Sequence, residues 1–293
     1  MQLTFLQSLT HRPFALIWSG QTISRLGDSL YRIALAWWVL EKTGSAAIMG
    51  AVLIFSFTPM LIFSLVGGVL VDRFPRVRIM IASDLLRGLA VGLVAALTFT
   101  QRLEIVHIYA VSVLFGLVDA FFQPAYTAVL PEIAPREILP SANSLTSLSG
   151  QFASIVGPAL GGALVGAGGT PIAFAVNAVS FLVSAACLAP LLRIPQPSHA
   201  GNERLNVAKE AMVGIKVVLG APWLWVTILI AALLNVTLSG PWSVALPFLI
   251  KDTLQKDAGT LGLVSSALSV GAVLAAVWLG RYSRLRRRGL IAY

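Results

Sequence analysis

Residues 138–192 of the chain read ILPSANSLTSLSGQFASIVGPALGGALVGAGGTPIAFAVNAVSFLVSAACLAPLL, and none of these 55 residues carries a charged side chain. One crossing of a bilayer needs roughly 20 predominantly apolar residues. The stretch is therefore long enough for two crossings. The segment GAGGTP at 166–171 predicts a break between them, because glycine and proline interrupt helices. A run of this length without charge cannot cover a soluble domain, so its surroundings must be lipid.

Composition extends this conclusion to the whole chain. Charged residues make up 11% of its 293 residues, where an ordinary soluble domain carries about 25%. Hydrophobic residues reach 57%, and the mean hydropathy is +0.85. A soluble protein of this size cannot hide so much apolar surface. The sequence therefore predicts an all-α membrane protein that crosses the bilayer several times.

Apolar segments along the chain predict eight spans that are separated by shorter polar connections. Their expected boundaries are 14–40, 46–71, 78–100, 105–130, 141–165, 171–192, 221–250 and 258–280. If the N-terminus is cytoplasmic, fourteen Lys and Arg residues outside the spans lie on the cytoplasmic side and four on the opposite side. Cytoplasmic loops of membrane proteins carry the excess of these residues. We therefore expect a multi-pass protein of the cell (inner) membrane with a cytoplasmic N-terminus.

Several classes of function do not fit the sequence. The net charge of +9 comes from short basic clusters between apolar runs, which is typical of membrane topology and not of nucleic-acid binding. The single cysteine, Cys187, has no disulfide partner, and His11, His107 and His199 are too scattered for a metal-binding motif. No phosphate-binding loop or Ser/His/Asp set occurs. We expect no metal, no cofactor and no enzymatic activity, and a monomer.

Polar and ionisable side chains inside spans are costly, so each needs a reason. In the first span four such residues follow one another at spacings of four, three and four, which places them on one helical face. That face must point to the bundle interior or to a water-filled cavity. The fourth span adds two polar residues four apart, and the seventh adds one at its middle. We predict that these seven residues line a pathway for substrate and protons: Gln21, Arg25, Asp28, Arg32, Asp119, Gln123 and Asn235.

Two interpretations of these charges stay open. In the first, Asp28 or Asp119 exchanges a proton as the cavity alternates between hydrated and desolvated states, and the arginines of the first span couple that exchange to substrate or conformation. In the second, the charges of the first span neutralise one another and lock helices together. In the third span, Asp84 and Arg87 are three residues apart near the cytoplasmic side. We expect these two to form a structural ion pair.

The connection after the second span carries a more specific signal. The segment GVLVDRFPR at 68–76 resembles the cytoplasmic loop motif of the major facilitator superfamily, with Gly68, Asp72, Arg73 and Arg76 at the motif positions. Pro75 stands where the motif has its second glycine. The resemblance implies a cytoplasmic gate in which Asp72 acts as a latch.

A second match lies in the fifth span. Gly157, Pro158, Gly161 and Gly162 resemble the core of the antiporter motif that marks exporters in this superfamily. Upstream glycines of that motif are absent, because Ser144 and the alanine at 153 stand in their places. The alternative is a packing seam, since small residues let helices approach closely and proline permits a bend.

Further stretches over residues 14–190, such as LIWSGQ at 16–21 and VLPE at 129–132, resemble the bacterial branch with macrolide-efflux permeases and enterobactin exporters. The resemblance implies a secondary active transporter that works by alternating access. We expect proton-coupled efflux of a small amphipathic molecule such as a drug, macrolide or siderophore. The alternatives are an uptake permease of the same superfamily, a non-transporting membrane protein or an intramembrane enzyme.

The same resemblance implies a major-facilitator-type bundle of twelve spans in two halves. An Arg-rich pattern recurs at 73–78 and 281–286, which supports such a repeat. We expect a complete six-helix bundle at 1–193 and a cytoplasmic linker with an amphipathic helix at 194–220. Residues 221–293 then supply spans seven, eight and the start of nine, so we expect a fragment or truncated product that does not transport alone.

We predict that Asp72→Ala in the intact protein weakens the cytoplasmic gate and leaves the binding site unchanged, because a latch acts on the balance between two conformations. Engineered cysteines, labelled from each side of the membrane, measure the exchange between these conformations. Unaltered exchange in the variant contradicts a latch at this position.

Overall fold

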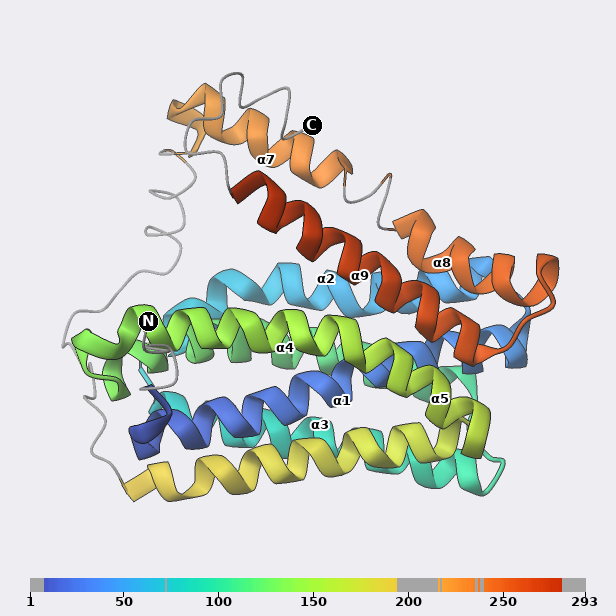
Figure 1. The fold of residues 1–293 in the computed structure, drawn as a ribbon, viewed down its shortest axis with the longest axis horizontal. Coiled ribbons are helices and arrows are strands. Elements are labelled where there is room, and N and C mark those ends of the chain that lie inside the picture. The colour runs from blue at the N-terminus through green and yellow to red at the C-terminus, as the bar shows by residue number, and fades with distance from the viewer. Residues whose placement is uncertain are drawn as a thin grey trace.

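The computed structural model of the protein describes residues 8–71, 73–193, 216, 218–234, 237 and 240–280. Within these residues every regular element is helical, which confirms the all-α class (Figure 1). The elements are α1 (Arg12–Thr43), α2 (Ala46–Val71), α3 (Arg76–Phe99), α4 (Ile105–Ile133), η2 (Arg136–Ile138), α5 (Leu139–Leu188), η3 (Ala189–Arg193), α7 (Pro222–Leu234), α8 (Gly240–Phe248), η5 (Leu249–Thr253) and α9 (Ala258–Gly280).

Helix ends follow signals that are present in the sequence. α1 ends at Gly44, whose φ of 57° suits glycine and whose N–H donates to the carbonyl of Leu40 at 3.0 Å. Glu104 and His107 form a capping box at the start of α4. Asp257 precedes α9 and accepts hydrogen bonds from the N–H and the hydroxyl of Thr260, which lower the pKa of its carboxyl.

α5 is two helices joined at a kink. Gly169 has φ 77° and ψ 172° inside it, and Pro171 follows. A positive φ breaks the helical path, and proline removes a backbone donor. We call residues 139–168 the first arm and 170–188 the second arm. The two arms confirm the expected break within the uncharged run.

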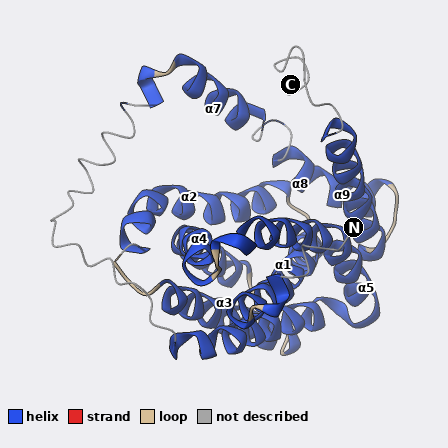
Figure 2. Ribbon diagram, turned by 60° about the vertical axis from the view of Figure 1, so that its left-hand side comes forward, coloured by secondary structure: helices blue, strands red, loops and turns tan. Residues whose placement is uncertain are grey.

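α1 packs against both arms of α5, and glycines make these contacts possible (Figures 1 and 2). A Cβ placed on Gly161 of the first arm would lie 2.8 Å from the Cα of Leu30. A Cβ placed on Gly27 of α1 would collide with Asn177 and Ser180 of the second arm. Only glycine fits at such approaches, so small residues set the spacing of these helices.

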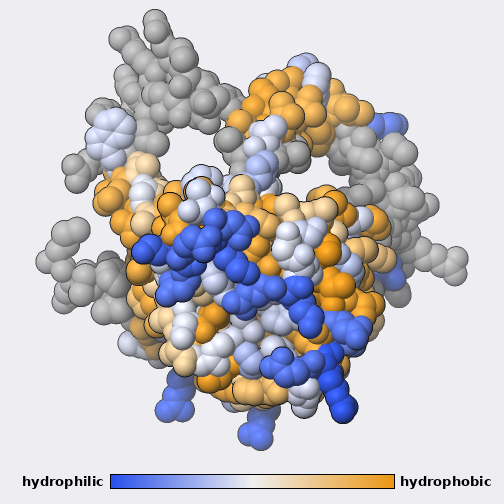
Figure 3. All heavy atoms as spheres, turned by 90° about the vertical axis from the view of Figure 1, so that its right-hand side faces the viewer, coloured by the Kyte–Doolittle hydropathy of each residue, from blue (hydrophilic) through white to orange (hydrophobic). Residues whose placement is uncertain are grey.

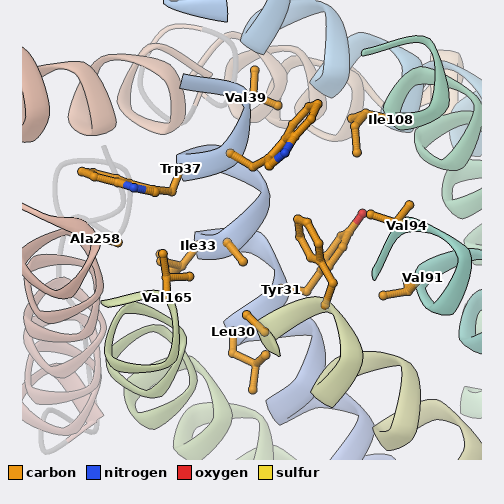
Figure 4. Close-up of a cluster of buried hydrophobic side chains, with 14 of the residues drawn as sticks. Leu30, Tyr31, Ile33, Trp37, Val39, Val91, Val94, Ile108, Val165 and Ala258 are labelled. Atoms are coloured by element: carbon orange, nitrogen blue, oxygen red, sulfur yellow. The ribbon is translucent and has the colours of Figure 1, made fainter. Parts of the chain in front are cut away.

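Aromatic and aliphatic side chains fill the space beside these contacts. The ring of Tyr31 lies 5.7 Å from that of Phe115 on α4 and 5.4 Å from that of Phe174 on the second arm. Figure 4 shows the cluster around α1, with Trp37 pointing away from Tyr31. Burial of these rings joins α1, α4 and α5 into one core.

One contact between the second half of the chain and the first is made through backbone. α9 lies along the first arm, where a Cβ on Gly162 would lie 2.5 Å from the carbonyl oxygen of Ala258. Near that point the N–H of Ala159 donates to the Ser266 hydroxyl at 3.0 Å. We call this contact the α5–α9 seam. At Gly162 itself no side chain fits between the two helices.

The surface of the described residues suits a bilayer. Five stretches are long and apolar enough to cross a membrane, and the polar stripe on α1 keeps that helix out of the set. They are Ala46–Ser64, Arg76–Phe99, Ile105–Ile133, Arg136–Arg193 and Ala258–Trp278. Figure 3 shows hydrophilic residues gathered across one end of the molecule and apolar residues along its sides. This is the expected distribution for helices that end at the two membrane surfaces.

The expected seventh span at 221–250 is described only in part. The described residues place α7 at one end of this range and α8 with the π-helical turn η5 at the other. Figure 2 shows α7 apart from helices α1 to α5. Gly240 and Pro241 are the first two residues of α8. The single span over 221–250 stays a prediction, because residues 235, 236, 238 and 239 lie outside the described part of the chain. The predicted amphipathic helix within 194–220 and the repeat at 281–286 lie mainly or wholly outside the described residues.

We predict that Gly161→Ala lowers the stability of the bundle, because the new methyl meets the backbone of Leu30. Overpacking of this kind costs about 1–3 kcal/mol. Gly166→Ala is the matched control, since that glycine is on the same arm with open space around its Cβ position. Thermal unfolding in detergent should show a lower midpoint for the first variant alone. Equal midpoints for the two variants would show that the contact is not tight.

Candidate functional site: a charged cavity inside the bundle

A cavity of about 490 Å³ lies between α1, α2, α4 and the first arm of α5, with one side chain of α3 in its wall. We call it the polar cavity. Its charged and amide-bearing lining residues are Gln21, Arg25, Asp28, Arg32, Arg87, Asp119 and Gln123. Six of the seven residues that the sequence assigned to the pathway therefore line one space. The seventh, Asn235, lies outside the described residues.

The packing of α1 turns its polar stripe toward this cavity. Gly20 and Gly27 face the second arm of α5, and Ala34 is buried among neighbouring helices. Because helical residues three and four apart share a face, the remaining face carries the stripe. The predicted inward orientation of the stripe is thus confirmed for its position, while its role stays a prediction.

Arg87 on α3 joins two acids from different helices. Its Nη2 atom lies 3.2 Å from Asp84 Oδ1, and its Nη1 atom lies 3.1 Å from Asp119 Oδ1 on α4. The Asp84 and Arg87 side chains are 0% and 4% exposed, and Asp119 is 32% exposed. The expected ion pair between Asp84 and Arg87 exists, but it is not isolated. It connects directly to one of the predicted pathway acids.

The far side of Asp84 is held by α1 and the second arm. The Ser184 hydroxyl donates to Asp84 Oδ2 at 2.7 Å, and Gln21 Nε2 donates to Ser184 Oγ at 2.9 Å and to Asp84 Oδ2 at 3.5 Å. The guanidinium of Arg87 also stacks over the ring of Phe122, 4.3 Å from its centroid. Buried charges are tolerated when they are paired and hydrogen-bonded in this way.

Arg25 makes its contacts within the bundle as well. Its Nη1 donates to the carbonyl of Thr146 on the first arm at 3.2 Å, and its guanidinium lies 4.9 Å from the centre of the Tyr126 ring on α4. These contacts join α1, α4 and α5. Arg25 thus resembles a packing residue in its geometry, although it faces the cavity.

Asp28 and Arg32 differ from the groups above. The Oδ1 atom of Asp28 is buried without a hydrogen-bond partner, and Asp28 forms no ion pair among the described residues. The charges that act on it are Arg87, Asp119, Arg32 and Asp84. Arg32 is exposed and donates to the Ser29 hydroxyl at 2.9 Å. The described residues therefore do not show the mutual neutralisation of Arg25, Asp28 and Arg32 that the structural interpretation requires.

A second cavity of about 380 Å³ adjoins the polar cavity and involves the second half of the chain. We call it the apolar cavity. It lies between α1 and α2 on one side and α8 and α9 on the other. Arg32, Leu35, Val52 and Leu53 line both cavities. A ligand in one cavity can therefore touch the same side chains as a ligand in the other.

The two predicted motifs occupy different places. Asp72 lies outside the described residues, Arg73 is exposed, and Gly68 has open space at its Cβ position. Arg76 forms an ion pair with Glu132 at the end of α4. The antiporter-like glycines lie in the first arm, at its contacts with α1 and α9. Their positions agree with the packing-seam interpretation.

Sequence reasoning left out some residues of this site. The sequence predicts only the pair of Arg87 with Asp84, because the contact of Arg87 with Asp119 depends on how α3 and α4 pack. Ser184 and Thr146 were not assigned at all, since a serine hydroxyl and a backbone carbonyl inside apolar runs carry no signal of their partners. The available signal for Arg87 was its charge inside a span.

Comparison with known families decides the identity. The family model described as Transmembrane secretion effector, a branch of the major facilitator superfamily, matches residues 4–292. The chain belongs to this family. The resemblance drawn from the loop motif and the fifth span is thereby confirmed, and the transporter is a multi-pass membrane protein of major-facilitator type.

Three relatives show the kind of transport. Macrolide efflux protein A of Streptococcus pyogenes is 24% identical over 279 residues, 95% of this chain and 68% of that protein. Multidrug efflux pump Tap of Mycolicibacterium fortuitum is 31% identical over 288 residues, 94% of this chain and 68% of that protein. Enterobactin exporter EntS of Shigella boydii is 27% identical over 287 residues, 96% and 66% respectively. The chain spans about two thirds of their length. These matches support a secondary transporter that exports small molecules, and these relatives are transporters, not enzymes.

We predict that Arg87→Gln destabilises the transporter strongly, because it leaves the carboxylate of Asp84 buried without a cation. Breaking a buried ion pair by removing one partner costs about 3–5 kcal/mol. Arg25→Gln is the comparison, since Arg25 donates to a backbone carbonyl and pairs with no acid among the described residues. The midpoint of thermal unfolding in detergent should fall further for Arg87→Gln. A smaller fall than for Arg25→Gln would mean that Arg87 is not needed to compensate Asp84.

Proposed function

We propose that this transporter exports a small amphipathic molecule, of the drug, macrolide or siderophore kind, across the inner membrane in exchange for protons. The N-terminus and the loop motif then face the cytoplasm, and the polar cavity is reached alternately from the two sides. The names of the relatives, which refer to macrolides, multiple drugs and enterobactin, support this range of substrates. The basic clusters on one side of the predicted spans support the orientation.

The observation that carries the proton coupling is the difference between Asp28 and the other two acids. Asp84 and Asp119 are both ion-paired with the single guanidinium of Arg87. Asp28 faces the polar cavity, and one of its carboxylate oxygens has no partner. An acid without a bound cation can exchange a proton each time the cavity is hydrated and closed, at no cost of a broken ion pair.

Asp119 offers a way to transmit that exchange. It is partly exposed to the cavity and is joined to Arg87, which is itself joined to Asp84. Asp119 and Asp84 are also among the charges that act on Asp28. A change of charge on Asp28 therefore alters the electrostatic balance of a network that connects α1, α3, α4 and α5. We infer that this network couples protonation to helix movement.

The two cavities suit an amphipathic substrate. The polar cavity supplies charges and amides, and the apolar cavity supplies aliphatic and aromatic walls with hydroxyl groups. Together they have the mixed lining of small-molecule sites, in which a few polar groups orient a mostly apolar ligand. The antiporter-like segment at 157–162 fixes α5 against α1 and α9 beside the cavities. We infer that this segment also marks the protein as an exporter.

We predict that Asp28→Asn in the intact protein abolishes efflux driven by a pH gradient and leaves membrane insertion normal, because the amide keeps the shape and cannot exchange the proton. Substrate flux from proteoliposomes with an imposed pH gradient measures this. Asp252→Asn, an exposed acid outside both cavities, is the control and should transport normally. Wild-type flux in Asp28→Asn rules out an essential charge at this position.

A further inference from the structure

We propose that the transported molecule is an acid whose anionic group is bound by Arg32 and whose apolar body occupies the apolar cavity. This rests on the proposed function, because it names the chemical class of the molecule that the cavities take. Arg32 is the charged residue that the two cavities share among the described residues that line them. It stands where a molecule with one charged end and one apolar end would change environment.

Arg32 is available to a ligand in a way that the other two arginines of the site are not. Arg87 is buried and binds two carboxylates, and Arg25 donates to a backbone carbonyl and stacks on a tyrosine ring. Arg32 is exposed, and among the described residues it donates a hydrogen bond to the neutral hydroxyl of Ser29. A guanidinium carries five donors in a planar fork. Most of that donor capacity is therefore still open to an acceptor from outside.

The acidic side chains near Arg32 do not form ion pairs with it. Asp28 is one turn away on the same helix and is close enough to interact electrostatically with Arg32, but the two form no ion pair. Asp119 is bound to Arg87, and Asp84 is fully buried behind it. A carboxylate or similar anion on a ligand would meet a cation whose charge is not compensated by contact. Planar two-point hydrogen bonding favours arginine for such groups.

The apolar cavity fits the other end of such a molecule. Its volume of about 380 Å³ lies in the range of pockets that hold small organic ligands, roughly 300–1,000 Å³. Apart from Arg32, its described lining is uncharged and includes Leu261, Leu268 and Trp242. Aliphatic and aromatic walls favour a ring or a branched chain by removing it from water. The charged end must then lie at the side where Arg32 stands.

A cationic ligand fits less well. It would need an open carboxylate beside the apolar cavity, and none of the described residues lining that cavity is acidic. The unpartnered oxygen of Asp28 is buried and belongs to the polar cavity. An amine bound in the apolar cavity would instead lie beside the positive charge of Arg32. Charge complementarity therefore favours the anion over the amine.

Binding of three matched probes tests this inference. 2-Naphthoate, the neutral 2-naphthamide and the cationic 2-naphthylmethylammonium share one ring system and differ in charge. We expect the intact protein in phosphatidylcholine nanodiscs to bind 2-naphthoate at least about tenfold more tightly than the amide, as a charge-assisted hydrogen bond allows. Calorimetric titration gives the three affinities. Equal affinity for acid and amide, or tighter binding of the amine, overturns the inference.

Three variants locate the site. Arg32→Gln should bring 2-naphthoate down to the affinity of the amide, while Arg32→Lys should keep part of the preference because it keeps the charge. Leu268→Trp fills the apolar cavity and should weaken acid and amide alike. A preference for the acid that survives in Arg32→Gln contradicts the assignment. If that variant does not fold, Arg32→Lys and Leu268→Trp carry the test, and wild-type binding of both probes in Leu268→Trp contradicts it.

Two further measurements separate related outcomes. Nanodiscs with phosphatidylglycerol replace a neutral lipid by an anionic one: competition with 2-naphthoate identifies a lipid as the acid, and its absence identifies a free small acid. The same purified protein is also reconstituted into proteoliposomes to measure flux. If the protein prefers the acid to the amide but shows no flux driven by a pH gradient, the proposed proton exchange is contradicted alone. If it shows such flux but no preference for the acid, only the acidic substrate is contradicted.

Discussion

The fit of α1 between the two arms of α5 is the contact on which the rest of the site depends. Gly27 lets the second arm approach α1 closely at Asn177 and Ser180, and Gly161 lets the first arm pack against Leu30. With both of those faces covered, the polar stripe of α1 points to the space beside α2 and α4. Lipid would not tolerate that stripe. The glycines thus decide where the charges lie, although they carry no chemistry themselves.

The charged side chains of the site fall into two groups, one that is joined by ion pairs and one that is not. Arg87 binds Asp84 and Asp119 and is stacked on Phe122, so this group ties α3 to α4. Asp28 and Arg32 lie one turn apart on α1, and neither forms an ion pair within the part of the chain that the structure describes. The first arrangement makes buried charges tolerable, and the second leaves a guanidinium that can bind a small ligand. Both meet at one cavity because five helices contribute to its wall.

Much of this could be predicted from the sequence, for reasons that lie in periodicity and cost. The stripe of Gln21, Arg25, Asp28 and Arg32 has helical spacing, so its shared face was predictable, and so was its inward orientation. The break in α5 was predictable from glycine and proline. The bond from Arg87 to Asp119 was not, because it depends on where α3 and α4 meet.

The α5–α9 seam and the cavities differ in what they are made of. The seam is backbone against backbone, where Gly162 and Gly262 leave no room for another atom, so substitution there changes the frame itself. The apolar cavity is walled by side chains such as Leu261 and Leu268, which can be exchanged one at a time without moving a helix. Ligand preference can therefore drift by single substitutions while the architecture stays fixed. One scaffold can in this way diversify toward chemically unrelated cargo.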